Sequence, residues 1–200
     1  MPNLTRQLVQ QLDDAAFEMG EIYAERGHLV ESAVSLDPAF TRNRRSRSSL
    51  TLDLMSEAFL TATSRVGLSP FRGTGGSVEL LADIPGGLAN VRLRRAERRS
   101  DEEYFVRANK ASTFGFVNEQ LMIPDYPFVF GFTLDEMEQA EFFVAEVVNV
   151  LEGNPGELVL GTPHLLGGAT APKPSAFDPD TDSWLPGFDE GEAGQGADTA

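Results

Sequence analysis

The spacing of the apolar residues changes once along the chain, and this change constrains the fold more than any other feature. Up to about residue 66, apolar side chains recur every three or four positions, which is the period of an amphipathic helix. After the glycine-rich residues 73–77, short runs alternate with a period of two or are rich in Val and Phe, as in strands. Helices first and strands afterwards predict an α+β fold.

Two main helices are expected in the first part of the chain. The first has Asn3 as its N-cap and ends at Gly27, where a glycine can adopt the left-handed conformation. Asp37 and Pro38 form the pattern of a cap followed by proline at the first helical position. The second main helix is expected over residues 49–66, and the arginine-rich stretch before it is expected to be an exposed approach or a polar first section.

About five or six strands are expected after the helices. The runs that favour a strand are residues 78–84, 91–95, 104–108, 128–134, 142–151 and 158–160. The turns between them are short, so we expect an antiparallel meander, in which the turn near Ser100 and Asp101 pairs 91–95 with 104–108. The helices are expected to pack on one face of this sheet or to fill a curved sheet.

The composition changes near residue 169. From there the chain consists mainly of Pro, Gly, Asp, Glu, Ala and Thr, with only four large apolar side chains. Too little apolar surface remains to offset the entropy of an ordered chain. We therefore expect one α+β domain over residues 1–168, followed by a disordered acidic tail over residues 169–200.

The cellular location is predicted from two observations on apolar runs. No run approaches the roughly 18–20 apolar residues that a membrane-spanning helix needs. The amino terminus becomes polar at once and offers no apolar core of a signal peptide. We expect a cytoplasmic protein that does not act at a membrane.

Charge is distributed unevenly along the chain. The net charge of −15 divides into −5 for residues 1–41, +5 for residues 42–110 and −15 for residues 111–200. Such segregation indicates electrostatic contacts within the molecule or with a partner, and it does not bear on the fold.

The densest positive charge is the arginine cluster Arg42, Arg44, Arg45 and Arg47. It precedes the second main helix, whose amino-terminal dipole favours anions. Nucleic-acid phosphates could bind there with an affinity that depends on salt and not on sequence. The alternatives are a solvated surface or pairing with acidic parts of the same chain. We rank nucleic-acid binding below these alternatives for two reasons. The total charge is negative, and the sequence has no helix-turn-helix, RNA-binding or zinc-finger pattern.

A second basic group comprises Arg92, Arg94, Arg95, Arg98 and Arg99. Alternation places Arg92 and Arg94 on one face of a strand, and we expect that face to be exposed to solvent. Charge on an edge strand, which prevents association between sheets, is the preferred explanation.

Aromatic and acidic side chains are interleaved in the tail, at Trp184, Leu185, Phe188, Asp189 and Glu190. A disordered segment of this kind can dock into a groove that is rimmed by basic side chains. The tail is therefore a candidate partner-binding segment, and a merely solubilising tail is an equal alternative.

No catalytic residue, metal site or cofactor is predicted. The chain has no cysteine, and its only histidines, His28 and His164, begin no metal-ligand spacing. The glycine-rich residues 73–77 lack the lysine of a phosphate-binding loop and are expected to be a flexible connection.

The carboxylates of the strand region allow one further hypothesis. Glu146 lies in an apolar run, so if buried it must be paired, and Arg92 or Arg107 could be the partner. An enzyme would require polar groups to converge on one pocket. The candidates for such convergence are Asp135, Glu141, Glu146 and His164.

Two stretches resemble proteins of a known kind: RNRRSRSSLTLDL at residues 42–54, and FVAEV at 143–147 continuing to GNPGELVLG at 153–161. They are similar to uncharacterised proteins of high-GC Gram-positive bacteria. This resemblance covers under a quarter of the chain and implies no particular activity.

Three functions follow in order of preference. The first is a non-enzymatic interaction or regulatory protein that acts on another protein through its domain and its acidic, aromatic tail. The second is an accessory protein that binds nucleic acid through the arginine cluster. The third is an enzyme of an unfamiliar class. The sequence indicates no oligomeric state.

Overall fold

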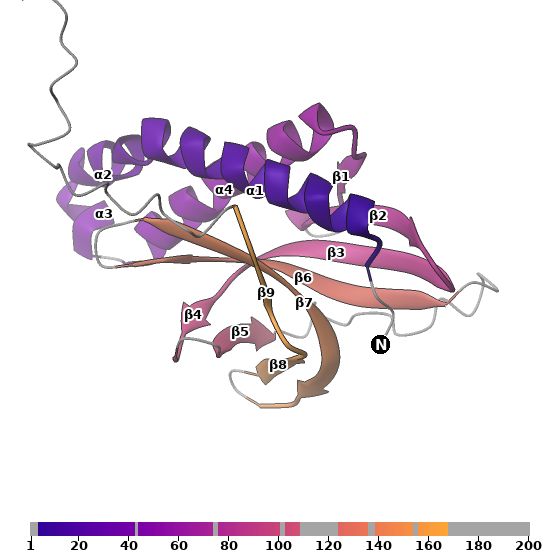
Figure 1. Ribbon diagram of the computed structural model, residues 1–200. Helices are drawn as coiled ribbons and strands as arrows, with labels where there is room; N and C mark the ends of the chain where they lie inside the picture. The colour runs from indigo at the N-terminus through magenta and orange to yellow at the C-terminus, as the bar shows by residue number, and fades with distance from the viewer. Residues whose placement is uncertain are drawn as a thin grey trace, which may run out of the picture. The chain divides into compact units, whose positions relative to one another are not determined.

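The computed structural model describes residues 4–42, 44–73, 76–100, 103–108, 124–135, 139–153 and 156–167, with only the backbone of Arg44. The chain divides after Ala169 into two units, and all described residues belong to the first. In this unit the helices cover one face of a curled, mostly antiparallel sheet, as Figure 1 shows. The fold is therefore α+β, as the change of apolar spacing predicts.

The helices come first along the chain, and the two long ones, α1 and α4, pack against each other. Their bounds are α1 Arg6–Arg26, α2 His28–Ser35, α3 Pro38–Arg42 and α4 Arg44–Arg65. Within the part of the chain that the structure describes, no helix combines the length and the apolar character needed to cross a membrane.

The helix ends differ in part from the expectation. Thr5 caps α1 in place of Asn3, because its hydroxyl accepts a hydrogen bond of 3.1 Å from the Leu8 amide. Gly27 has a φ of −57°, so it is not left-handed and the chain continues directly into α2. The cap at Asp37 is confirmed, since its carboxylate accepts a bond of 2.7 Å from the Ala39 amide. Helix α4 begins at Arg44, five residues before the expected start at 49, so that Arg44, Arg45 and Arg47 form the polar first section that was one of the two alternatives, while Arg42 ends α3.

The described residues form nine strands, where five or six were expected. They are β1 Pro70–Arg72, β2 Val78–Ile84, β3 Gly87–Arg95, β4 Glu97–Arg98, β5 Tyr104–Ala108, β6 Asp125–Leu134, β7 Ala140–Leu151, β8 Gly156–Leu160 and β9 His164–Leu166. The order in the sheet is β1-β2-β3-β6-β7-β8-β5-β4, with β9 also paired to β7.

The expected simple meander is wrong at its centre. Strand β3 lies between β2 and β6, antiparallel to the first and parallel to the second. The predicted pairing of 91–95 with 104–108 does not occur, because β5 pairs with the two-residue strand β4 and with β8. The chain leaves the central sheet at Ala96, whose amide still donates to Phe132 at 2.8 Å, and crosses to the other end of the sheet.

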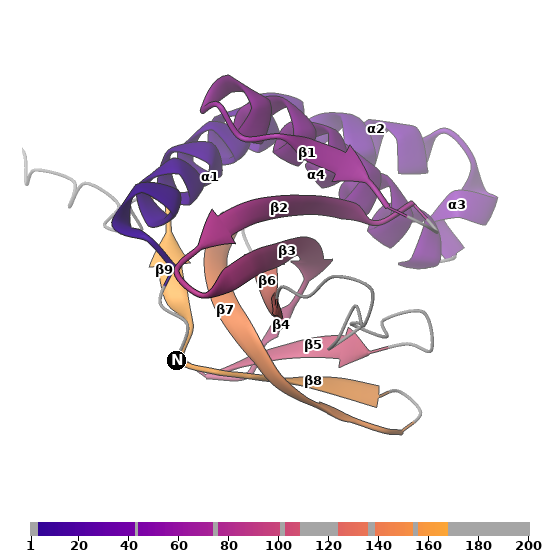
Figure 2. The same ribbon diagram turned by 90° about the vertical axis from the view of Figure 1, so that its right-hand side faces the viewer.

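The sheet curls because β7 belongs to both of its halves. Its first part pairs with β6, and its second part pairs with β8 after a register shift between Val147 and Asn149. Figure 2 shows β7 passing from the layer beneath the helices to the layer of β5 and β8. The curled sheet therefore has an outer face toward the helices and an inner face.

Each face has its own apolar core. The outer core joins α1 and α4 to the sheet and includes an edge-to-face contact of Phe59 with Phe130, with ring centroids 5.0 Å apart. The inner core is smaller and centres on Phe143, whose ring is stacked on Tyr104 at 4.0 Å. Side chains alternate between the two cores along β6 and the first half of β7, so these segments are buried on both sides.

At Gly131 on β6, the packing of the inner core leaves no room for a side chain. A Cβ at this position would overlap the ring of Phe143. Since Phe143 is completely buried, its ring has no free space into which it can turn.

We predict that Gly131→Ala lowers the free energy of unfolding by about 1–3 kcal/mol through overpacking, as measured by urea denaturation. Gly161→Ala is the matched control, because a Cβ there would make only ordinary contacts of 3.7–3.8 Å. Equal stability of the two variants would contradict the close approach of Phe143 to the β6 backbone.

Candidate functional site

The arginine cluster lies on the surface where α3 ends and α4 begins. Arg42, Arg45 and Arg47 are exposed, and the side chain of Arg44 is outside the described residues. Arg47 forms an ion pair with Glu31 of α2. The charge of Arg47 is therefore compensated within the domain, which is the kind of internal pairing given above as an alternative to nucleic-acid binding.

A groove that we call the helical groove lies beside this cluster, between α2, α3 and the start of α4. It has a volume of 490 Å³, and its lining includes Ala33, Leu36, Phe40 and Leu50, with Arg45 among them. Leu36 is 83% exposed and Phe40 is 47% exposed, and with Leu50 they form a contiguous apolar lining. The groove combines an apolar surface with a basic rim.

The exposure of these side chains follows from how the short helices pack. Helices α2 and α3 make their main contacts with each other and with α4, and not with the sheet. Val30 and Val34 of α2 are buried in this packing. The helix ends at Ser35, and Leu36 follows it at the surface.

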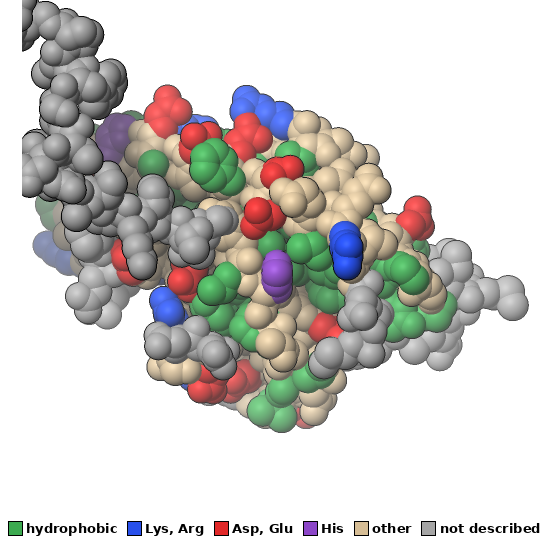
Figure 3. Space-filling view, in the orientation of Figure 1, with side chains coloured by type: hydrophobic (Ala, Val, Ile, Leu, Met, Phe, Trp, Pro, Cys, Tyr) green, Lys and Arg blue, Asp and Glu red, His purple; other side chains and the backbone are tan. Residues whose placement is uncertain are grey.

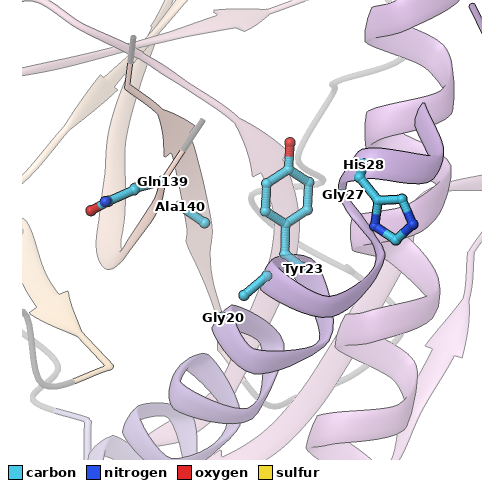
Figure 4. Close-up of a pocket in the computed structure, with 7 residues that line it drawn as sticks. Gly20, Tyr23, Gly27, His28, Gln139 and Ala140 are labelled. Carbon is cyan, nitrogen blue, oxygen red and sulfur yellow. The ribbon is translucent and has the colours of Figure 1, made fainter. Parts of the chain in front are cut away.

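A second hollow, of 410 Å³, lies between the end of α1, the start of α2 and the start of β7. Figure 4 shows Tyr23 standing between Gln139 and His28, both of which point away from it. A catalytic site requires polar groups that converge on a common point, and the polar side chains of this hollow do not converge.

The inner face of the sheet carries charged and polar side chains that the sequence pattern does not identify as a site. They come from three adjacent strands and we call them the inner-face network: Glu79 of β2, Asn90, Arg92 and Arg94 of β3, and Asp125 of β6. The residues next to them along the strands, such as Leu80 and Val91, point to the opposite face and belong to the outer core. Strand alternation therefore forces these polar side chains inward.

Glu79 and Arg92 are direct neighbours across the β2–β3 pair. Arg92 Nε lies 3.3 Å from Glu79 Oε2, and the side chains are only 14% and 10% exposed. The expectation that Arg92 lies on a solvent-exposed edge strand is wrong, because β3 is internal and its inner face is largely covered. Burial of an unpaired guanidinium would be costly, and Glu79 supplies the compensating charge.

The glycine-rich stretch positions the carboxylate of Glu79. The Ser77 hydroxyl donates to Glu79 Oε1 at 2.6 Å, and the Gly73 amide donates to the Ser77 carbonyl at 2.7 Å. A Cβ on Gly73 would lie 2.8 Å from Glu79 Cδ and closer still to Oε1. Gly73 therefore allows the carboxylate to pack against the backbone. These contacts give the described part of the stretch a role that its composition alone does not indicate.

Arg94 lies on the same face as Arg92, two residues further along β3. Burial lowers the pKa of its guanidinium, the positive charge of Arg92 lowers it further, and Glu79 opposes both. Its Nε is buried without a hydrogen-bond partner, and the structure gives its side chain no ion pair across the described ranges. The charge of Arg94 is thus only partly compensated.

Asp125 begins β6 at the edge of the network. Burial raises the pKa of its carboxyl group above the ordinary 3.8, and the Asn90 amide and the charge of Arg92 lower it in part. Its Oδ1 atom is buried and has no hydrogen-bond partner. Asp125 is therefore a carboxylate whose ionised form is not fully stabilised by the fold.

The predicted partners of Glu146 are incorrect. Arg92 pairs with Glu79, and Arg107 pairs with Glu97 of β4. Glu146 lies opposite Phe128 in the β6–β7 ladder, which places it toward the helices and away from both arginines.

The four side chains named as candidates for a catalytic site do not converge on one pocket. Glu141 accepts a hydrogen bond of 2.7 Å from the Tyr104 hydroxyl and pairs with Arg98 at 3.1 Å. Glu146 faces the helices, Asp135 follows the end of β6, and His164 is exposed on β9. None of the four lines either hollow described above.

Two further features concern metal binding and the tail. Within those ranges, no three His, Asp or Glu side chains are grouped so that they could hold a metal ion. The tail residues Trp184, Leu185, Phe188, Asp189 and Glu190 lie outside the described residues. On the face in Figure 3, basic and acidic side chains are interspersed and not gathered by sign.

Comparison of the chain with family models, with curated proteins and with solved structures finds no match.

We predict that Glu79→Gln lowers the free energy of unfolding by about 3 kcal/mol, because it removes the carboxylate that pairs with the buried guanidinium of Arg92. Glu57→Gln is the control, since Glu57 pairs with Arg72 on the surface, and its effect should be within about 1 kcal/mol. Urea denaturation measures both variants. A Glu79 variant as stable as the Glu57 variant would show that the pair is not buried in solution.

We predict that Asp125→Asn stabilises the protein at neutral pH. The raised pKa of Asp125 means that the folded state disfavours the ionised carboxylate. This penalty is fully present above the raised pKa and is lost as the pH falls toward 3.8, where the group becomes protonated in both states. The advantage of the variant should therefore shrink with decreasing pH.

Thermal unfolding at several pH values measures this difference. Asp83→Asn, at an exposed position of β2, accounts for the general effect of removing one negative charge. An advantage of Asp125→Asn that grows as the pH falls would contradict the burial of this carboxylate.

Proposed function

We propose that this protein is a non-enzymatic interaction protein whose helical groove binds an acidic segment of another protein with a large apolar side chain as its anchor. The observation that carries this proposal is the exposure of Leu36 and Phe40 around a hollow of 490 Å³ that also contains Arg45. An exposed apolar hollow beside polar residues is the usual form of a protein–protein interaction site.

The apolar surface supplies the binding energy in this proposal. Covering a leucine or phenylalanine side chain contributes about 1.5–3 kcal/mol, and Leu36 is almost entirely uncovered. One inserted aromatic or aliphatic residue of the partner would contact Leu36, Phe40 and Leu50 together. Such a central anchor is typical of interfaces in which a few residues carry most of the energy.

The basic rim determines which apolar segment is favoured. Arg42 and Arg45 are exposed near the groove, and Arg47 remains half-exposed despite its pair with Glu31. Acidic side chains that flank the anchor would be attracted to this rim, which raises the association rate and selects against basic segments. A nucleic acid would use the arginines but would leave the apolar surface uncovered, so it is the second candidate.

The tail residues 178–190 have the chemistry that the groove requires. Their sequence, DPDTDSWLPGFDE, has five carboxylates around Trp184 and Phe188. A synthetic peptide of this sequence is therefore a suitable probe of the groove, whether the physiological segment belongs to another protein or to this chain.

We predict that this peptide, labelled with a fluorophore, binds to the full chain in a fluorescence anisotropy titration. The double variant Leu36→Ser, Phe40→Ser should weaken binding about tenfold or more, because it removes the apolar anchor site. Leu29→Ser is the matched control, since Leu29 is a half-exposed residue of α2 that does not line the groove. Unchanged binding by the double variant would contradict the proposal.

Two further binding measurements distinguish this proposal from binding of the chain's own tail and from binding of nucleic acid. Tighter peptide binding by a full chain that carries Trp184→Ala and Phe188→Ala would indicate that the chain's own tail competes for the groove. A single-stranded oligonucleotide that binds the wild type and the double variant equally, but not an Arg42→Gln, Arg45→Gln variant, would support the nucleic-acid function instead.

A further inference from the structure

The inner face of β3 presents two arginines, and among the described residues a carboxylate pairs with Arg92 but not with Arg94. Arg92 and Arg94 are two residues apart on one strand, so their side chains leave the sheet about 7 Å apart on the same side. Glu79 pairs with Arg92 at 3.3 Å. No ion pair of Arg94 is seen in the part of the chain that the structure describes.

The local charges leave Arg94 with a positive charge that is not neutralised. The two charged groups that act on it are Arg92 and Glu79, which have opposite signs. Its Nε atom is buried and makes no hydrogen bond. A buried donor of a charged group normally has a partner, and the absence of one is a specific feature that needs an explanation.

The surroundings of Arg94 limit the size of any ligand. Its neighbour on β6 is Gly131, which has no side chain, and the ring of Phe143 fills the space above this glycine. Tyr104 is stacked on Phe143 and is also buried. The ligand must therefore be compact on this side, because both aromatic rings are fixed in the inner core.

We propose that Arg92 and Arg94 form a binding site for a compact oxyanion, either a phosphate or a carboxylate group. A guanidinium group donates two parallel hydrogen bonds to two oxygens of such a group, and two adjacent arginines can hold it from both sides. Glu79 and Ser77 fix the position of Arg92. The other carboxylate of the inner-face network, Asp125, lies opposite Leu88, six residues from Arg94 along β3, and Glu79 is the only carboxylate among the charges that act on Arg94. The bound anion supplies the missing partner of Arg94. This site is separate from the helical groove.

Isothermal titration calorimetry of the full chain with inorganic phosphate, with acetate and with chloride, at matched ionic strength, tests the proposal. We expect saturable binding of phosphate or acetate and none of chloride. Binding of phosphate alone identifies a phosphoryl group as the ligand, and binding of acetate alone identifies a carboxylate. The absence of saturable binding by both overturns the proposal.

The variant Arg94→Gln should weaken the binding about tenfold or more, the loss expected when hydrogen bonds to a charged group are removed. Arg95→Gln is the matched control, because Arg95 is the next residue on β3 but is exposed and contacts Ser48 of α4 at 3.0 Å. It should bind as the wild type does. Equal losses in the two variants would overturn the proposal.

A second measurement does not depend on how well the glutamine variant folds. Arg94→Met keeps an unbranched side chain of similar length and removes the uncompensated charge. We expect it to have a higher thermal midpoint than the wild type in chloride, and to show no increase on addition of phosphate or acetate. A lower midpoint in chloride, or an anion-dependent increase as large as that of the wild type, would overturn the proposal.

Discussion

The structure depends on the pairing of β3 with a neighbour on each side. Since β2 and β6 use the hydrogen-bonding groups of both its edges, β3 lies inside the sheet, and both its faces must be accommodated. Its apolar positions pack under α1 and α4. Its polar positions face inward, where Arg92 requires Glu79, and the carboxylate of Glu79 in turn requires Ser77 and the absence of a side chain at Gly73.

The two layers of the domain leave different surfaces for interaction. On the inner side, the curl at β7 brings Tyr104 onto Phe143 and closes an apolar core next to the charged side chains. On the outer side, the long helices α1 and α4 pack on the sheet, and α2 and α3 make their main contacts with other helices. Helix α2 buries Val30 and Val34, α3 has no buried residue, and Leu36 and Phe40 are exposed beside the arginines. A groove for a protein segment and a site for a small anion thus arise from separate parts of the fold.

The sequence predicts the outer core well and the inner face poorly, for physical reasons. Apolar spacing in α1 and the alternation of Phe128, Phe130 and Phe132 depend only on local geometry, and both were predicted correctly. The alternating arginines of 91–95 suit an exposed edge strand as well as an internal strand that faces a buried carboxylate. The decisive partner, Glu79, is on a different strand, and the parallel β3–β6 pair joins residues separated by a long excursion of the chain. One signal for this partner was available in the sequence. Glu79 lies between Val78 and Leu80, so alternation places an acidic side chain on the face of the strand opposite to these apolar residues.

Native-state hydrogen exchange along β3 tests the central claim most directly. In the structure, the Leu88 amide donates to Pro124 on the β6 side at 2.9 Å, and successive amides from Leu88 to Arg92 point in turn to β6 and to β2. The account predicts that all of these amides are protected to a similar degree, because each has a partner. Fast exchange of every second amide would mean that β3 is an edge strand, and would contradict the burial of Arg92 and Arg94 on an inner face.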